Sequence, residues 1–150
     1  VTGVQTCALP ISYHPIFDVT FDEAYAAASR NPGYTQELCE ALWQTSSEGD
    51  TLRPADVARA LEAVFDRERE HYVFYVKQLT ALQFRVLRAL ALHGGREIYA
   101  ARFLEAANTV NRTSVKKAVA KIEKADLVYR HDAEYRFVNP FFREWIKRGF

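Results

Sequence analysis

Several patterns that would identify an enzyme or a membrane protein directly are missing from this sequence of 150 residues. It contains no Gly-x-x-x-x-Gly-Lys-Ser/Thr loop to hold phosphates and no strand-borne acidic residue to hold Mg²⁺, so we expect no ATP hydrolysis by this chain itself. No apolar run reaches the length of a membrane-spanning helix. The sequence therefore predicts no catalytic residue, no cofactor and no membrane partner.

Cysteine and histidine are also scarce. The two cysteines, Cys7 and Cys39, have neither the spacing of a metal site nor that of a redox motif, and the four histidines are scattered. We therefore expect no metal site and no disulfide framework. A reducing, cytoplasmic setting is the corresponding expectation.

What the sequence does contain is a division of charge along the chain. A hydrophobic content of 49% is enough to bury the core of one ordinary domain or two small ones. The first 79 residues carry six Lys and Arg against twelve Asp and Glu, whereas residues 80–150 carry fourteen against seven. Such asymmetry often marks a nucleic-acid-binding face in the basic half and a protein-facing or solvated surface in the acidic half.

The acidic half reads as a set of helices. Residues 22–30 are rich in alanine and predict a short helix, which residues 31–33 (Asn-Pro-Gly) end. A period of 3.6 residues resumes over 34–44, and residues 45–50 predict a loop. A proline in a first helical turn then opens a long helix over 54–78.

One charged run in that long helix, residues 66–71, could suggest acid–base chemistry. On a helix, however, Asp66/Arg69 and Arg67/Glu70 are pairs three residues apart, which lie close together on the helix surface. We therefore interpret the run as a charged, solvated face.

A second domain is predicted to begin at Thr80. The four residues 80–83 (Thr-Ala-Leu-Gln) fit a capping box, in which the Thr80 hydroxyl and the Gln83 side chain satisfy free backbone groups at the start of a helix. The helix is expected over 81–93, with Gly94-Gly95 after it. We place the domain boundary between residues 79 and 80.

The basic half continues with a definite order of short elements. Ile98 is expected in a short strand, residues 100–107 in a compact helix and residues 108–110 in a tight turn. Asn111 then caps a third helix that runs to Ala125. The apolar residues at helical spacing predict its buried face: Val115, Ala118, Val119 and Ile122.

The end of the chain predicts a hairpin and a last helix. Asp126 stands where a left-handed residue is expected, and residues 127–130 and 135–138 are strand-prone runs joined by 131–134. Asn139-Pro140 opens an amphipathic helix. The predicted fold class is mainly α with a small β wing, a helical subdomain followed by a winged helix-turn-helix domain.

The third helix of that domain is the candidate DNA-contacting element. With its apolar face buried, Thr113, Lys117, Ala120 and Lys124 turn outward, with Lys116 and Lys121 beside them. Lysines suit phosphate contact better than base readout, so binding to double-stranded DNA would be sensitive to salt and low in sequence selectivity. The alternative is that this face packs against the helical subdomain or a protein partner. The candidate DNA-binding residues are Arg112, Thr113, Lys116, Lys117, Lys121, Lys124, Arg130 and Arg136.

Several of these segments together resemble one family. The Asn-Pro-Gly-Tyr segment at 31–34, the Leu-Thr-Ala-Leu-Gln segment at 79–83, the Thr-Ser-Val start of the third helix at 113–115 and the Asn-Pro-Phe-Phe-Arg-Glu-Trp segment at 139–145 are similar to archaeal-type P-loop ATPases. These form part of the STAND branch of the AAA+ superfamily. The resemblance covers residues 13–150. It implies a helical lid over residues 12–79, followed by a winged-helix domain over 80–150.

The resemblance also implies a role for the segment between the first two helices. In the family this part of the lid reads Gly-His/Asn-Pro and lies close to the nucleotide. Here the nucleotide-proximal positions are Arg30, Asn31, Pro32 and Gly33, so an arginine replaces the first glycine. Arg30 could approach the phosphates as a sensor cation, or it could be a solvated residue favoured by the negative end of a helix dipole.

Residues 1–11 (VTGVQTCALPI) resemble the in-frame translation of a common sequencing adapter, matching it in all eleven codons. We expect this segment to be foreign to the protein and exclude it from the fold, together with Cys7. The chain would then lack a preceding nucleotide-binding domain, its partner in the parent ATPase, where ATP and Mg²⁺ are bound. The competing hypothesis is a stand-alone winged-helix transcription regulator with a helical dimerisation region.

Overall fold

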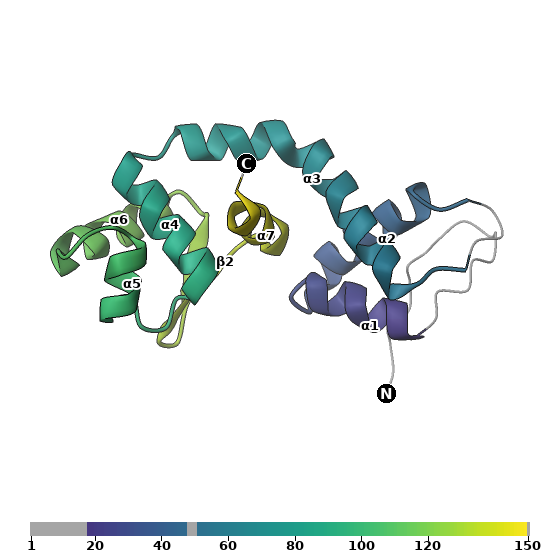
Figure 1. Ribbon diagram of the computed structural model, residues 1–150, viewed down its shortest axis with the longest axis horizontal. Coiled ribbons are helices and arrows are strands. Elements are labelled where there is room, and N and C mark those ends of the chain that lie inside the picture. The colour runs from purple at the N-terminus through teal and green to yellow at the C-terminus, as the bar shows by residue number, and fades with distance from the viewer. Residues whose placement is uncertain (1–17, 48–50, 150) are drawn as a thin grey trace. The chain divides into compact units, whose positions relative to one another are not determined.

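The computed structural model describes residues 18–47 and 51–149 (Figure 1). The fold is mainly helical with one small antiparallel sheet of two strands, as the sequence predicts. The chain forms two compact units, residues 1–68 and 69–150, and one long helix runs through the boundary. Within the described ranges, no helix has the length and apolar character that a bilayer crossing requires.

The first unit contains α1 (Asp18–Ala27), α2 (Pro32–Gln44) and most of α3 (Pro54–Lys77). The helix predicted over 22–30 ends earlier, because Ser29 and Arg30 adopt left-handed φ angles of 53° and 58°. The Arg30 N–H donates to the Tyr25 carbonyl and the Ser29 N–H to the Ala26 carbonyl, which is a Schellman ending. The segment predicted over 45–50 lies partly outside the described residues.

Asn31 does more than stop the first helix. Its Oδ1 accepts the backbone N–H groups of Gly33 at 3.0 Å and Tyr34 at 3.3 Å, so Asn31 is the N-cap of α2. Pro32 occupies the first turn, where its missing N–H costs nothing. The second helix therefore starts two residues before the predicted position.

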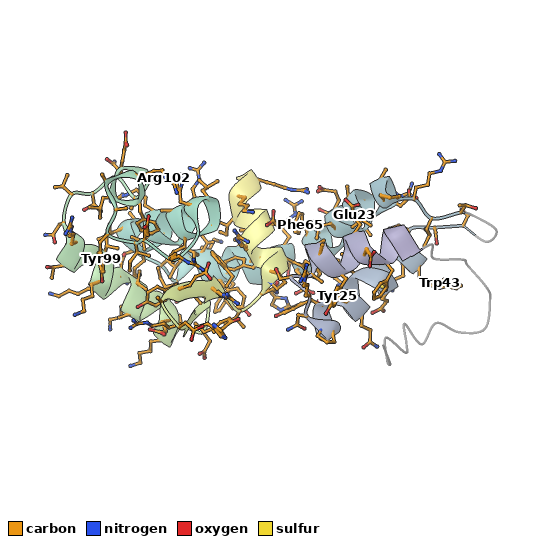
Figure 2. All side chains as sticks on the ribbon, turned by 90° about the horizontal axis from the view of Figure 1, so that it is seen from below. Glu23, Tyr25, Trp43, Phe65, Tyr99 and Arg102 are labelled. Atoms are coloured by element: carbon orange, nitrogen blue, oxygen red, sulfur yellow. The ribbon has the colours of Figure 1, made fainter. Side chains whose placement is uncertain are left out.

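The helices of the first unit bury an apolar core, and their side chains are drawn in Figure 2. Arg67 on α3 bonds Glu37 on α2 and its neighbour Glu68. The ion pair between Arg67 and Glu37 links α3 to α2. The buried core residues of this unit are Ala24, Ala28, Leu38, Cys39, Ala41, Leu42, Leu52, Val57, Ala60, Leu61, Val64 and Phe65.

The second unit opens as predicted. The Gln83 N–H donates to the Thr80 hydroxyl at 3.3 Å and the Thr80 N–H donates to Gln83 Oε1 at 2.8 Å, which completes the capping box of α4 (Ala81–His93). Gly94 ends α4 with a φ of 78°, which glycine adopts without steric cost. The short helix α5 (Ala101–Ala106) and α6 (Arg112–Lys124) follow.

The strand expected at Ile98 does not form. Ile98 is buried in a loop, and the segment between α4 and α5 pairs with the sheet only through a single bridge between Gly95 and Tyr135. A side chain on Gly95 would overlap the Tyr135 backbone, so the close approach depends on glycine. The additional strand is thus reduced to one residue, three positions before the expected one.

The wing is formed by β1 (Val128–His131) and β2 (Glu134–Phe137), which pair antiparallel. Its turn consists of two residues, with Asp132 at a φ of 53°, so the predicted four-residue connection at 131–134 is too long. Asp126 has the predicted left-handed φ, at 55°. Asn139 caps α7 (Pro140–Arg148) by accepting two backbone N–H groups, as predicted.

An aromatic cluster ties the end of α3 to the winged-helix unit. The Tyr72 ring lies 5.1 Å from the Phe142 ring and 5.4 Å from the Trp145 ring, measured between centroids. Tyr75 and Phe137 also contact Phe142, at 5.8 and 6.2 Å. This compact unit therefore begins at Arg69, upstream of the capping box at which the sequence places the boundary.

We predict that Tyr72→Ala lowers the free energy of unfolding of this unit by about 3 kcal/mol, because a fully buried aromatic ring is lost from the cluster. Phe74→Ala, two residues away on the same helix and 58% exposed, is the matched control and should change little. Urea unfolding followed by Trp145 fluorescence, in a Trp43→Phe background, measures both. Equal effects of the two substitutions would contradict the cluster's role.

Candidate nucleic-acid interface

The helix α6 presents two chemically distinct faces. Val115, Ala118, Val119 and Ile122 are buried, as predicted, with relative exposures of 4% or less. Asn111 fixes the start of the helix by accepting the Ser114 N–H at 3.1 Å. The six residues predicted to contact DNA on this helix are all exposed: Arg112, Thr113, Lys116, Lys117, Lys121 and Lys124.

The cations on α6 are electrostatically uncompensated. None of the five has an ion pair with any residue in the described part of the chain, and the helix carries a single acidic residue, Glu123. An unpaired lysine or arginine retains its full attraction for an external anion, whereas a paired one must first give up its partner. This face is therefore suited to binding a polyanion.

A groove of about 570 Å³ runs beside this face, between α6 and the start of α4. Lys117, Lys121 and Lys124 line it from α6, and Leu82 with Gln83 line it from α4. The groove could not be predicted from the sequence, because it arises from the packing of two helices. Leu82 and the alanines of α6 supply an apolar wall against which lysine stems can lie.

The two wing arginines lie on opposite faces of the hairpin. Arg136 is paired across the strands with Tyr129, and Arg130 with Tyr135. Neighbouring pairs in a sheet point to opposite sides, so the two guanidinium groups do not form one cationic surface. Contact of Arg130 and Arg136 with DNA stays a prediction, and each guanidinium group would reach a duplex from its own side of the wing.

Each wing arginine also has a partner within the wing. Both Nε and Nη2 of Arg136 donate to Glu134 Oε2, at 3.1 and 3.0 Å. Hydrogen bonding to Glu134 and the negative charge of its carboxylate raise the pKa of Arg136 above its ordinary value. The Arg130 Nε donates to the Asp132 carbonyl at 3.3 Å, and its guanidinium carbon lies 6.0 Å from the centre of the Tyr135 ring. Glu134 and Tyr135, which were not among the predicted site residues, thus contact the two wing arginines.

The four positions predicted to lie near a nucleotide form the connection between α1 and α2. Arg30, Asn31, Pro32 and Gly33 are all exposed. Arg30 lies three residues beyond the last residue of α1, in a left-handed conformation. Asn31 uses its side-chain oxygen to cap α2.

Metal chemistry finds no support within the described ranges. No group of three or more His, Cys, Asp or Glu side chains comes together there in a way that could hold a metal ion. Cys39 is buried in the core of the first unit and forms no disulfide.

Comparison with known families identifies one match. The family model described as "Probable winged helix domain" matches residues 70–148, which is more than half of the chain. Comparisons with curated proteins and with solved structures give no significant match. The matched range agrees with the second compact unit, including the end of α3 and the wing. The winged helix is a fold consistent with DNA binding. By this match, the chain belongs to the winged helix domain family.

Proposed function

We propose that the winged helix domain binds double-stranded DNA through the exposed face of α6, with low sequence selectivity. The observation that carries this proposal is that all five cations of α6 are exposed and none is paired within the described residues. In helix-turn-helix domains the helix after the turn enters the major groove, and α6 directly follows the turn at Asn108.

The side chains on this face favour phosphate contact over base readout. Four of the five exposed cations are lysines, which meet a phosphate as compact point charges, and Arg112 at the first residue of α6 is the one guanidinium on this helix. The other outward side chains, Thr113 and Ala120, offer no paired donors to a base edge. Phosphate contacts position a protein on the duplex without reading its sequence. Binding should therefore weaken steeply as salt is added, because each contact releases condensed counterions.

We predict that Lys117→Glu combined with Lys121→Glu weakens binding of the full chain to a fluorescently labelled duplex about 10-fold or more at low salt. Two phosphate contacts are lost and two repulsive charges are added. The slope of log affinity against log salt concentration should become shallower by about 2. Fluorescence anisotropy titrations at several salt concentrations measure both quantities.

A double charge reversal outside α6 is the matched control. Lys77→Glu combined with Arg88→Glu changes the net charge equally at two exposed positions. Arg88 does not line the groove, and helical spacing puts it about 120° around α4 from Leu82, which does. This control should lose little affinity for the duplex. In a separate measurement of selectivity, the unsubstituted chain should bind two unrelated duplexes of equal length with almost equal affinity. Unchanged affinity in the α6 variant would exclude this face as the DNA contact and favour a protein partner there.

We further predict that Glu134→Gln strengthens duplex binding several-fold at low salt, because it releases Arg136 and removes a negative charge. The salt slope should become steeper by about 1 if the freed guanidinium contacts a phosphate. Glu105→Gln removes the same charge from an exposed position on α5 and serves as the control. If both substitutions change the affinity equally, only net charge is responsible and Arg136 has no specific role.

We also propose that this domain is part of a longer ATPase of the archaeal type. The resemblance of residues 79–83 and 139–145 to that family supports the proposal, and both segments begin helices of the winged helix domain. A nucleotide-binding domain in the parent would hold ATP and Mg²⁺, and residues 30–33 would belong to its lid. The alternative is a stand-alone transcription regulator whose helical region mediates dimerisation.

Sequencing the locus from genomic DNA decides between these two proteins. An ATPase parent predicts a phosphate-binding loop within about 200 residues upstream, the size of one nucleotide-binding domain. A start codon directly before the α1 region would rule out the ATPase. The same sequence shows whether the genome encodes residues 1–11 or other codons in their place.

A further inference from the structure

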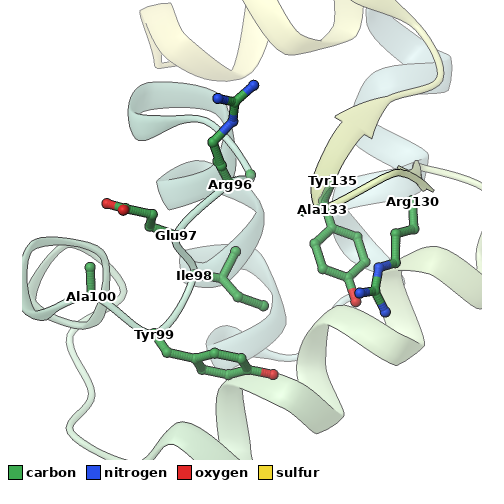
Figure 3. A pocket seen from close by; sticks show the side chains of 9 residues that line it. Arg96, Glu97, Ile98, Tyr99, Ala100, Arg130, Ala133 and Tyr135 are labelled. Carbon is green, nitrogen blue, oxygen red and sulfur yellow. The ribbon is translucent and has the colours of Figure 1, made fainter.

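A separate pocket lies between the loop at residues 95–100 and the wing (Figure 3). Its volume is about 420 Å³, within the range of small-ligand sites. The loop lines one side, and Arg130, Ala133 and Tyr135 line the other. No residue of α6 contributes, so the pocket is distinct from the proposed duplex-binding face.

The two walls of the pocket are fixed to each other. The Tyr135 N–H donates to the Gly95 carbonyl at 3.1 Å, which ties the loop to β2. The absence of a side chain on Gly95 permits this approach. Ile98 is 5% exposed and anchors the middle of the loop in the core. The pocket is therefore built by packing rather than by two independently moving segments.

The side chains at the opening combine aromatic rings with one cation. Figure 3 shows the Tyr99 ring on one side, and the Tyr135 ring with the Arg130 guanidinium on the other, while Arg96 and Glu97 point away. Tyr99 is 39% exposed. The hydroxyl groups of Tyr99 and Tyr135 have no hydrogen-bond partner among the described residues, and Arg130 has no carboxylate partner there.

These groups define the chemistry of a ligand. Tyrosine rings favour a flat aromatic ring, which they bind by stacking. The guanidinium favours a phosphate or carboxylate, which it binds through two parallel N–H groups. A simple anion would leave the tyrosines unused, and an uncharged ring would leave Arg130 unused. A nucleobase carrying a phosphate satisfies both.

We propose that this pocket binds one unpaired nucleobase together with its phosphate, with the base against Tyr99 and Tyr135 and the phosphate on Arg130. Two sources supply that chemistry: a free mononucleotide, or the unpaired end of a DNA strand. The proposal stands on the pocket alone, and only its second source rests on the proposed DNA binding.

The test titrates the full ¹⁵N-labelled chain with AMP, adenosine and inorganic phosphate. AMP should change the NMR chemical shifts of the Arg130 Nε–H group and of the backbone amides that line the pocket. Adenosine and phosphate should each bind more weakly than AMP. Tyr99→Ala should weaken AMP binding about 10-fold, the effect expected for the loss of one base–aromatic stack. Arg130→Gln should remove the advantage of AMP over adenosine.

The opposite face of the wing provides matched controls, because Tyr129 and Arg136 form there the same kind of cross-strand pair. Tyr129→Ala and Arg136→Gln should leave AMP binding unchanged. AMP shifts that these controls abolish, or that map outside the pocket, would overturn the proposal. Equal binding of AMP and adenosine by the original chain would overturn the role of Arg130.

A second arm identifies the source of the nucleotide. A duplex with a single-base overhang should bind more tightly than the blunt duplex if strand ends are the ligand, and Tyr99→Ala should remove that difference. Equal binding of both duplexes together with AMP binding assigns the site to free nucleotides. If the protein binds neither AMP nor the overhang, the proposal is refuted. The separate proposal of duplex binding through α6 is tested by Lys117→Glu with Lys121→Glu on the blunt duplex.

Discussion

The burial of one face of α6 against α4 determines the properties of the winged helix domain. Each large apolar side chain transferred from water into the core contributes about 1.5–3 kcal/mol, and Val115, Val119 and Ile122 are all buried in this way. Rotation of the helix about its axis would expose these residues and bury lysines without partners, at considerable cost. The packing therefore sets the direction of the cations, and the DNA-facing surface is a consequence of the core.

The wing depends on a second constraint, the close contact between Gly95 and Tyr135. The two strands of a hairpin are marginal alone, and here they gain support from this bridge and from the contact of Phe137 with Phe142 on α7. The same bridge holds the 95–100 loop beside Arg130. One backbone contact thus stabilises the wing and builds the pocket next to it.

Much of the fold could be predicted because its signals are local. The capping box at Thr80, the Asn111 and Asn139 caps and the left-handed Asp126 each involve residues within a few positions, and all are confirmed. The predictions that failed depend on distant partners. The bridge falls at Gly95 rather than Ile98 because Tyr135, forty positions away along the chain, selects it.

The candidate site shows the same division. Helical periodicity alone placed the α6 lysines on the exposed face, because the buried positions are apolar and regularly spaced. Periodicity could not show that Arg136 forms an ion pair with Glu134. Nor could it show that Arg130 and Arg136 lie on opposite faces of the hairpin. Counting basic residues treats all of them as equal, whereas their pairing makes them unequal. The lysines of α6 have no ion-pair partner among the described residues, whereas Arg136 is paired with Glu134. Four such lysines outnumber the one wing arginine without a carboxylate partner, so the helix should contribute more than the wing to the attraction for phosphate.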